Sequence, residues 1–506
     1  MDRGRQGQHH PLAARGAAQP RGGRKKNETP LRDAFDGLLE QCDASRRLRS
    51  HLTAALLSPD RATVSNLICL GGRADADWTA DYRLYSRGRA DAEALLDGAL
   101  AEVLAATPAQ GPLVFGVDDT TVRKTGRRIP GVAWRRDPLG PAFRTNLMAG
   151  QRFLMFSAAW PLGDGDARML PVRFGHAPTA RRPAPGASPE ELEAWRELKR
   201  RTSLGARAVE GMEALARRCP GRRIVFCGDG GYTNGTVVKR LPADCRFIGR
   251  VRQDAKLHFP PNPADGGGSG RPKVYGDRAP TPGELLADDS VPWREAEGFA
   301  SGRKHLFRVK EVGGLLWRPA GGAARLRLLV IAPLRYRLRK GPKLLYRRPA
   351  FLICTDPALT AEEILQCYLW RWGVEVNFRD AKQLVGVGDA QVRTELQRDA
   401  AGGACGRLFP AVGVGAEAAG VRHRPRGRAR RAEMASAGRE RAQDAQHGAT
   451  AARAAHGMLA PESTPGGFQG VPGTSDRGRE AAEISLPSER TVPNSLKTGL
   501  PREDRS

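Results

Sequence analysis

Apolar positions along the chain follow two spacings, and the change from one to the other falls near residue 109. From Leu31 to Ala106, apolar residues recur at steps of three and four, which predicts a helical region. Beyond it, short apolar runs bounded by Gly and Pro predict strands. These strands are expected at 111–116, 153–159, 169–174, 223–228, 247–251, 306–312, 326–331 and 351–354. The pattern indicates an α/β protein preceded by a helical region.

One helix within the α/β part has a clear start. Ser188 is suited to cap it, Pro189 suits the first helical position, and Glu191 completes a capping box. The helical pattern continues to Arg218 with an interruption near 203–205.

Two of the expected strands end in acids. The run GPLVFG leads into Asp118 and Asp119, and the run ending at Gly228 leads into Asp229. Acids at strand ends in an open α/β sheet reach a shared site. Taken alone, an Asp-Asp pair after a strand is more often a turn or a helix cap, so the order of the motifs carries the argument.

A third acid lies on a predicted helix near the end of the patterned region. Tyr368, Arg371, Glu375 and Lys382 fall at steps of three, four and seven, which brings them near one helix face. The apolar spacing that predicts the helix is Leu365, Leu369 or Trp372, Val376 and Phe378. A carboxylate flanked by an aromatic ring and two cations suits a phosphodiester site, although a solvated charged face is the plain alternative.

This four-residue pattern resembles the Tyr-x2-Arg-x3-Glu-x6-Lys signature of IS4-type (IS701-like) DDE transposases of bacterial insertion sequences. Asp118-Asp119-Thr120 is similar to the motif of the family's first catalytic aspartate, and Asp229-Gly230-Gly231-Tyr232 to that of the second. The match makes Asp118 the first acid, because it stands two residues before Thr120. Asp119 is its rival, being directly followed by Thr.

The resemblance implies an RNase H-like α/β/α catalytic core with a β-rich insertion between the second aspartate and the glutamate. It implies that Asp118, Asp229 and Glu375 are catalytic and hold two Mg²⁺ or Mn²⁺ ions. Oxygen ligands and the lack of a His/Cys cluster fit these metals better than zinc. Tyr368, Arg371 and Lys382 are implied to contact DNA phosphates rather than to attack them.

Charge supports a polyanionic partner. The 506 residues carry a net charge of +27 with a pI near 10.6, and nucleic acid is the commonest partner of such a chain. We expect double-stranded DNA, namely the transposon terminal inverted repeats and the target, with a homodimer in the synaptic complex. No apolar run approaches the ~18–20 residues of a membrane span. The eight scattered cysteines and the lack of a secretory signal predict a cytoplasmic protein. The resemblance implies that it is bacterial and nucleoid-associated.

The expected organisation has six segments. They are a disordered basic arm (1–29), a helical DNA-binding domain (30–108), the first part of the core (109–245), the β-rich insertion (246–356), the glutamate helix (357–395) and a disordered tail (396–506). In the tail, Ala, Gly and Arg dominate and too little apolar surface is present to offset chain entropy. The tail is either a frameshifted translation or a true basic tail, which the other reading frames of the gene would decide.

Two functions remain open from the sequence, and a third is disfavoured. The first is an active transposase that cuts and joins DNA ends, and the second is an inactive truncated relic that only binds DNA. A tyrosine recombinase using Tyr368 is the third and needs an Arg/His cluster that the sequence does not supply.

Overall fold

The computed structural model describes the central part of the chain, with short gaps. The described residues are 40, 45–58, 61–87, 92–126, 129–137, 140, 143–163, 165–262, 272–336, 345–346, 348–383 and 386–389. The expected basic arm (1–29) and tail (396–506) lie outside them.

The N-terminal part is helical, as predicted. Its helices are α2 (Arg46–Leu57), α3 (Val64–Leu70), α4 (Thr79–Ser86) and α5 (Ala92–Ala106). The Ser45 and Thr63 hydroxyls cap α2 and α3 by accepting backbone N–H bonds. In the aromatic run of this region Tyr85 is buried and bonded to His51, whereas Tyr82 is 45% exposed.

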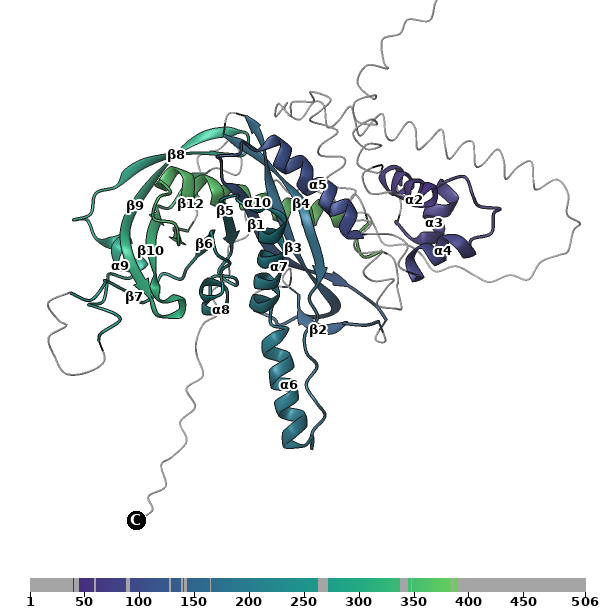
Figure 1. The fold of residues 1–506 in the computed structure, drawn as a ribbon, viewed down its shortest axis with the longest axis horizontal. Helices are drawn as coiled ribbons and strands as arrows, with labels where there is room; N and C mark the ends of the chain where they lie inside the picture. Colours follow the sequence, from purple (N-terminus) through teal and green to yellow (C-terminus); the bar gives the residue numbers. More distant parts are fainter. Residues whose placement is uncertain are drawn as a thin grey trace, which may run out of the picture.

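The centre of the molecule is a mixed sheet. Its core strands are β1 (Leu113–Arg123), β2 (Ala133–Arg136), β3 (Leu147–Gly163), β4 (Asp166–His176), β5 (Ile224–Gly228) and β6 (Cys245–Arg250). Strand β3 pairs antiparallel with β1, β2 and β4, while β1, β5 and β6 run parallel. The order β4-β3-β1-β5-β6 is that of an RNase H-like core, so the expected fold class is confirmed (Figure 1).

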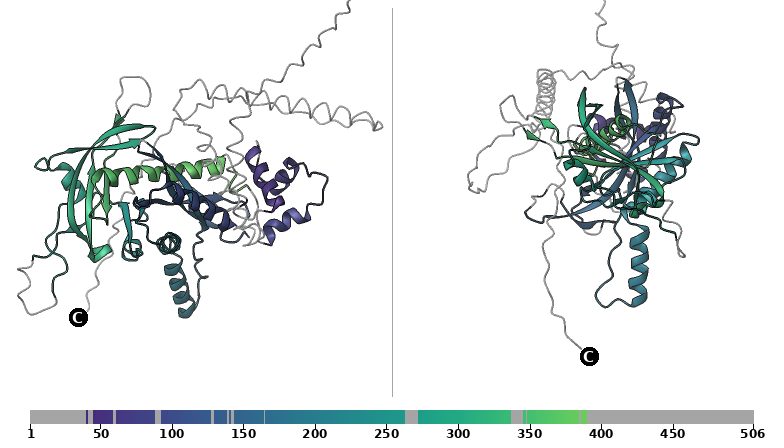
Figure 2. Two further views of the ribbon diagram at one scale, coloured as in Figure 1. Left: turned by 45° about the horizontal axis from the view of Figure 1, so that its top comes forward. Right: turned by 90° about the vertical axis from the view of Figure 1, so that its left-hand side faces the viewer.

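Helices cover both faces of this sheet. On one face α7 (Leu204–Arg218) packs closely, and a Cβ added at Gly211 would lie 2.3 Å from the Phe156 ring. It follows α6 (Pro189–Arg201), which begins with the expected Ser188–Glu191 capping box and projects from the core (Figure 2). The short α8 (Gly235–Lys239) follows β5. The other face carries α10 (Ala361–Gln383), which completes an α/β/α sandwich.

The β-rich insertion continues the same sheet. It contains β7 (Leu257–His258), α9 (Pro282–Ala287), β8 (Arg294–Ala300), β9 (Arg303–Trp317), the 3-10 turn η3 (Arg318–Ala320), β10 (Gly321–Ile331), β11 (Arg335–Tyr336), β12 (Leu345–Tyr346) and β13 (Ala350–Cys354). Strand β13 pairs antiparallel with β6, and β10, β9 and β7 follow outward. The insertion is therefore joined to the core by backbone hydrogen bonds.

Two local expectations need correction. Strand β1 does not end at its acids, because β3 pairs with it as far as Arg123. The buried stripe of α10 includes Leu365 and Phe378, as predicted, but Leu369, Trp372 and Val376 are only half-buried. The stripe comprises Ala361, Ile364, Leu365, Cys367, Arg371, Val374, Asn377, Phe378 and Ala381.

Candidate active site

The two predicted aspartate motifs meet at the junction of β1 and β5. Val117 pairs with Gly228, the last residue of β5, so Asp118 and Asp229 follow side by side on parallel strands. The Asp229 carboxylate accepts a 2.8 Å bond from the Gly231 amide, and the turn that follows is closed by the amides of Tyr232 and Thr233 on the Asp229 carbonyl. The fold thus brings together two acids that are far apart in the sequence.

Adjacent residues of a strand point to opposite faces, and this separates Asp118 from Asp119. Asp118 lies on the α10 face, where its Oδ2 is 3.2 Å from Arg371 Nη1. Asp119 lies on the α7 face, where its Oδ1 accepts a 2.9 Å bond from the Tyr232 hydroxyl. A backbone link remains, since the Asp119 amide donates to Asp118 Oδ1 at 2.8 Å.

Arg371 connects two of the predicted acids. Its Nη2 is 3.0 Å from Glu375 Oε1, so one guanidinium bridges Asp118 and Glu375. The side chain is buried, lies over the Tyr368 ring at 5.4 Å, and keeps an Nε atom that has no hydrogen-bond partner among the described residues. The Tyr368–Arg371–Glu375 face of α10 therefore faces the acid of β1 rather than solvent.

Lys382, near the C-terminal end of α10, also contacts β1. Its Nζ donates to Thr120 Oγ1 at 2.7 Å and to the Thr121 carbonyl at 3.1 Å. Partial burial of the ammonium lowers the pKa of Lys382, although the residue as a whole is exposed.

Close packing fixes α10 over the site. A Cβ at Gly116 would lie 2.7 Å from Val374 Cγ2, so only glycine permits this approach of helix to strand. The buried Asn377 amide donates to Ser157 Oγ at 3.1 Å and to the Met169 carbonyl at 2.9 Å. These bonds tie the middle of α10 to β3 and β4.

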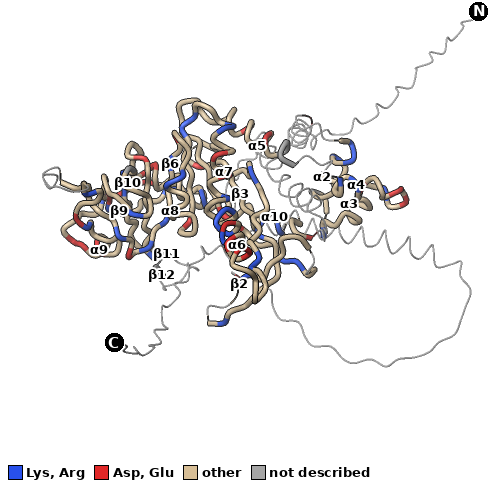
Figure 3. The backbone as a smooth tube through the Cα atoms, turned by 60° about the horizontal axis from the view of Figure 1, so that its bottom comes forward, with Lys and Arg blue, Asp and Glu red and all other residues tan. Residues whose placement is uncertain are grey.

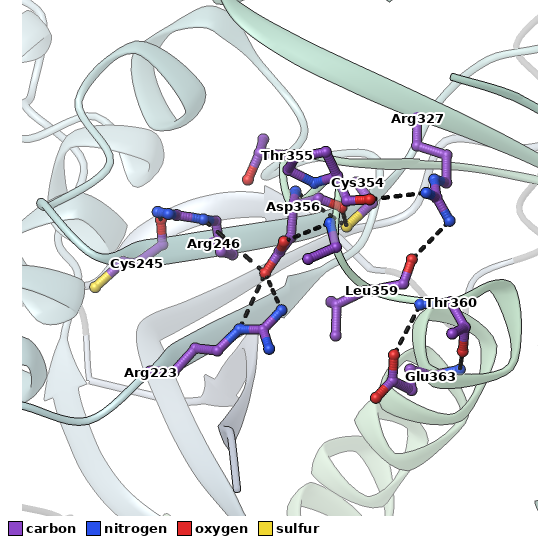
Figure 4. A network of polar contacts seen from close by, with 12 residues as sticks. Arg223, Cys245, Arg246, Arg327, Cys354, Thr355, Asp356, Leu359, Thr360 and Glu363 are labelled. Atoms are coloured by element: carbon purple, nitrogen blue, oxygen red, sulfur yellow. Dashed lines mark hydrogen bonds and ion pairs between the residues drawn. The ribbon is translucent and has the colours of Figure 1, made fainter. Parts of the chain in front are cut away.

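The start of α10 is tied to the opposite end of β5. Asp356, in the turn before the helix, accepts a 3.1 Å bond from Arg223 Nε and lies 4.0 Å from Arg246 (Figure 4). Thr360 and Glu363 cap the helix by exchanging side-chain bonds with each other's backbone amides. The strand that leads to Asp229 and the helix that carries Glu375 thus share an anchor.

Burial dominates the electrostatics of the β1 acids. It raises the pKa of Asp118 to about 7, against the lowering effect of Arg371 and together with the repulsion of Asp229. Burial also raises the pKa of Asp119, against the hydrogen bond of Tyr232 and the charge of Arg152. Crowded, desolvated carboxylates of this kind mark functional sites.

Among the described residues, no group of three or more His, Cys, Asp or Glu side chains is arranged to hold a metal ion. Arg371 lies between Asp118 and Glu375 at this place and forms an ion pair with each of them. Asp118 and Asp229 nevertheless fit a hard cation, because both are oxygen ligands and the charge of Asp229 raises the pKa of Asp118.

The sequence reasoning passed over Tyr232 as a site residue. It is 1% exposed, and its hydroxyl joins the turn after Asp229 to Asp119. Tyr232 lies three residues after Asp229, inside the Asp-Gly-Gly-Tyr motif, and this position is the sequence signal that could have identified it. Burial raises the pKa of Tyr232 well above its ordinary value, so it acts as a hydrogen-bond donor.

The RNase H-like sheet, with carboxylates at its β1–β5 junction, defines the class as proteins of the RNase H-like fold. A family model described as DDE superfamily endonuclease matches residues 34–310. Because that match covers more than half of the 506 residues, the chain belongs to the DDE superfamily endonucleases. The family implies DNA as substrate, and its members generally use divalent metal ions.

The family match ends before α10, so it includes Asp118 and Asp229 but not Glu375. None of the curated proteins matches the chain. In the described part of the chain, no helix is both long and apolar enough to cross a membrane.

Proposed function

We propose that the protein is an IS4-type DDE transposase that cuts DNA at the ends of an insertion sequence and transfers the cut strand to target DNA. The observation that carries this proposal is the arrangement at the β1–β5 junction. Asp118 and Asp229 are neighbours there, and Arg371 holds Glu375 over the same strand.

Asp118, Asp229 and Glu375 would hold the divalent metal, Mg²⁺ or Mn²⁺. When bound, two such ions would supply activation of the attacking oxygen and stabilisation of the leaving oxygen. For Glu375 to join the other acids, Arg371 would give up its ion pairs, and the phosphates of DNA are the natural alternative partners for its guanidinium. Tyr368, Arg371 and Lys382 would then position the DNA backbone.

The remaining parts of the proposal follow the expected organisation. Residues 30–108 would bind the transposon ends. Residues 109–245 and 357–395, together with β6, would form the catalytic core, and the rest of 246–356 would form the insertion. The net charge of +27 supports a DNA partner, and Figure 3 shows Lys and Arg interspersed with Asp and Glu along the described backbone. The proposal also includes a homodimer in the synaptic complex and a cytoplasmic, nucleoid-associated location.

The test is cleavage of a DNA fragment carrying the element's own ends, with Mg²⁺ or Mn²⁺, by the wild type and by Glu375→Gln. Glu362→Gln is the matched control, because Glu362 lies on the same helix but pairs with Arg294 on the surface. We expect metal-dependent cleavage by the wild type and the control only.

Binding without cleavage by any of the three proteins would identify an inactive relic. Cleavage that survives Glu375→Gln but not Tyr368→Phe would instead identify a tyrosine recombinase.

A further inference from the structure

The α7 face of the sheet carries a second set of charged groups beside the acids. Arg152 on β3 pairs in register with Thr121 and therefore shares the face of Asp119. Arg135 on β2 pairs with Met148, an even number of residues from Arg152, and so points to the same face. Two arginines from neighbouring strands thus converge where Tyr232 holds Asp119.

The segment after β4 supports both guanidinium groups from one side. Arg152 Nε donates to the Ala177 carbonyl at 3.1 Å, and Arg135 Nη2 donates to Thr179 Oγ1 at 2.8 Å. Both side chains are half-buried, which limits their freedom to turn away. The two groups are therefore preorganised rather than dispersed in solvent.

These two cations are not neutralised within the described part of the chain. Neither forms an ion pair with a carboxylate there, and the buried Nε of Arg135 has no hydrogen-bond partner. Burial lowers the pKa of Arg135, and the charge of Arg152 lowers it further, so the two guanidinium groups repel each other. Asp119 is the acid that both act on, and it already accepts the Tyr232 hydroxyl.

We propose that Arg135 and Arg152 together bind one phosphate of the DNA backbone, on the side of the acids opposite to α10. This inference rests on the proposed function, because it takes DNA as the ligand. Paired guanidinium forks match the oxygens of a phosphodiester and would regain the hydrogen bonds that they lack. DNA would then be held on both sides of β1, by Lys382 on one and by this pair on the other.

The test measures how DNA binding depends on salt, without divalent metal, for the full chain and a duplex from the DNA that flanks the gene. Losing one phosphate contact reduces the slope of log K against log salt by about 1. We expect this reduction in Arg135→Gln and in Arg152→Gln. The double variant should also lose about 1 rather than about 2, because both residues hold the same phosphate.

Two further variants and a modified DNA sharpen the test. Arg136→Gln is the matched control, since Arg136 is the exposed neighbour on the other face of β2 and should keep the wild-type slope. Arg152→Lys keeps the charge and should restore the slope. Replacing single phosphates by neutral methylphosphonates should reveal one position that weakens binding by the wild type but not by the double variant.

An unchanged slope in both Gln variants, with lowered thermal stability, would overturn the proposal and make the arginines an internal support for Asp119. An equal loss in Arg136→Gln would overturn it as well, because only diffuse attraction would remain. A protein that binds but never cuts DNA would refute the proposed function, while the slopes would still decide this inference.

Discussion

Asp118 and Asp119 are identical neighbours on one strand, yet the two faces of the sheet give them different surroundings. Asp118 meets a buried arginine that also holds Glu375, whereas Asp119 meets a tyrosine hydroxyl and two more distant arginines. Strand alternation points the two carboxylates to opposite faces, where different partners meet them. The comparison teaches that, in an Asp-Asp pair, the elements packed on each face decide which carboxylate lies beside the arginine that holds Glu375.

The largest expected effect compares the two acids directly. Asp118→Asn should lower metal-dependent cleavage by about 10³-fold or more, since a lost metal ligand removes several kcal/mol of transition-state stabilisation. Asp119→Asn should cost only about 10–100-fold, as for a group that supports the ligands. Single-turnover cleavage rates measure both.

DNA binding without metal is the control and should change little in either variant. A reversed order of the two losses would make Asp119 the first catalytic acid and would break the comparison.

The next effect concerns Arg371, the buried cation that pairs with Asp118 on the α10 face. Arg371→Met should lower the free energy of unfolding by about 3 kcal/mol, because two partly buried carboxylates lose the cation that pairs with both. Arg379→Met on the same helix removes an ion pair with Asp380 in which the arginine side chain is 45% exposed, and should cost at most about 1 kcal/mol. Urea unfolding measures both, and equal losses would show that Arg371 contributes no more than a surface pair.

These surroundings were only partly predictable from the sequence. The cap at Ser188, the succession of strands along the chain and the helix that carries Glu375 follow from local patterns, because caps and periodicity act over a few residues. The orientation of α10 does not follow from them. Counting apolar residues selected Val376, whereas the structure buries Arg371 and Asn377 instead.

Distant partners explain the difference. Arg371 is buried because it forms an ion pair with Asp118. Asn377 is buried because Ser157 and the Met169 carbonyl accept its hydrogen bonds. The same reason applies to β1, which continues past its acids because β3 is long enough to pair with it. A pattern along one segment carries no information about the partner that a fold places against it.

The last prediction uses pH to separate buried from exposed acids in the metal-free protein. The folded-state pKa of Asp118 is about 7, raised from an ordinary value of 3.8 by burial, with Asp229 adding to it against Arg371. The folded protein therefore binds this proton more tightly than the unfolded chain does. The resulting stability is present at low pH and is lost as the pH rises from about 4 to about 7.

Asp118→Asn lacks this titration, so its stability relative to the wild type should increase over that range by about 4 kcal/mol and then level off. Asp254→Asn is the opposite control. Hydrogen bonds from Arg252 lower the pKa of this exposed carboxyl, so its small contribution to folding stability is lost as the pH falls. Urea unfolding in a chelator at several pH values measures both slopes. Parallel curves for the wild type and Asp118→Asn would mean that Asp118 is solvated, and the contrast with exposed acids would fail.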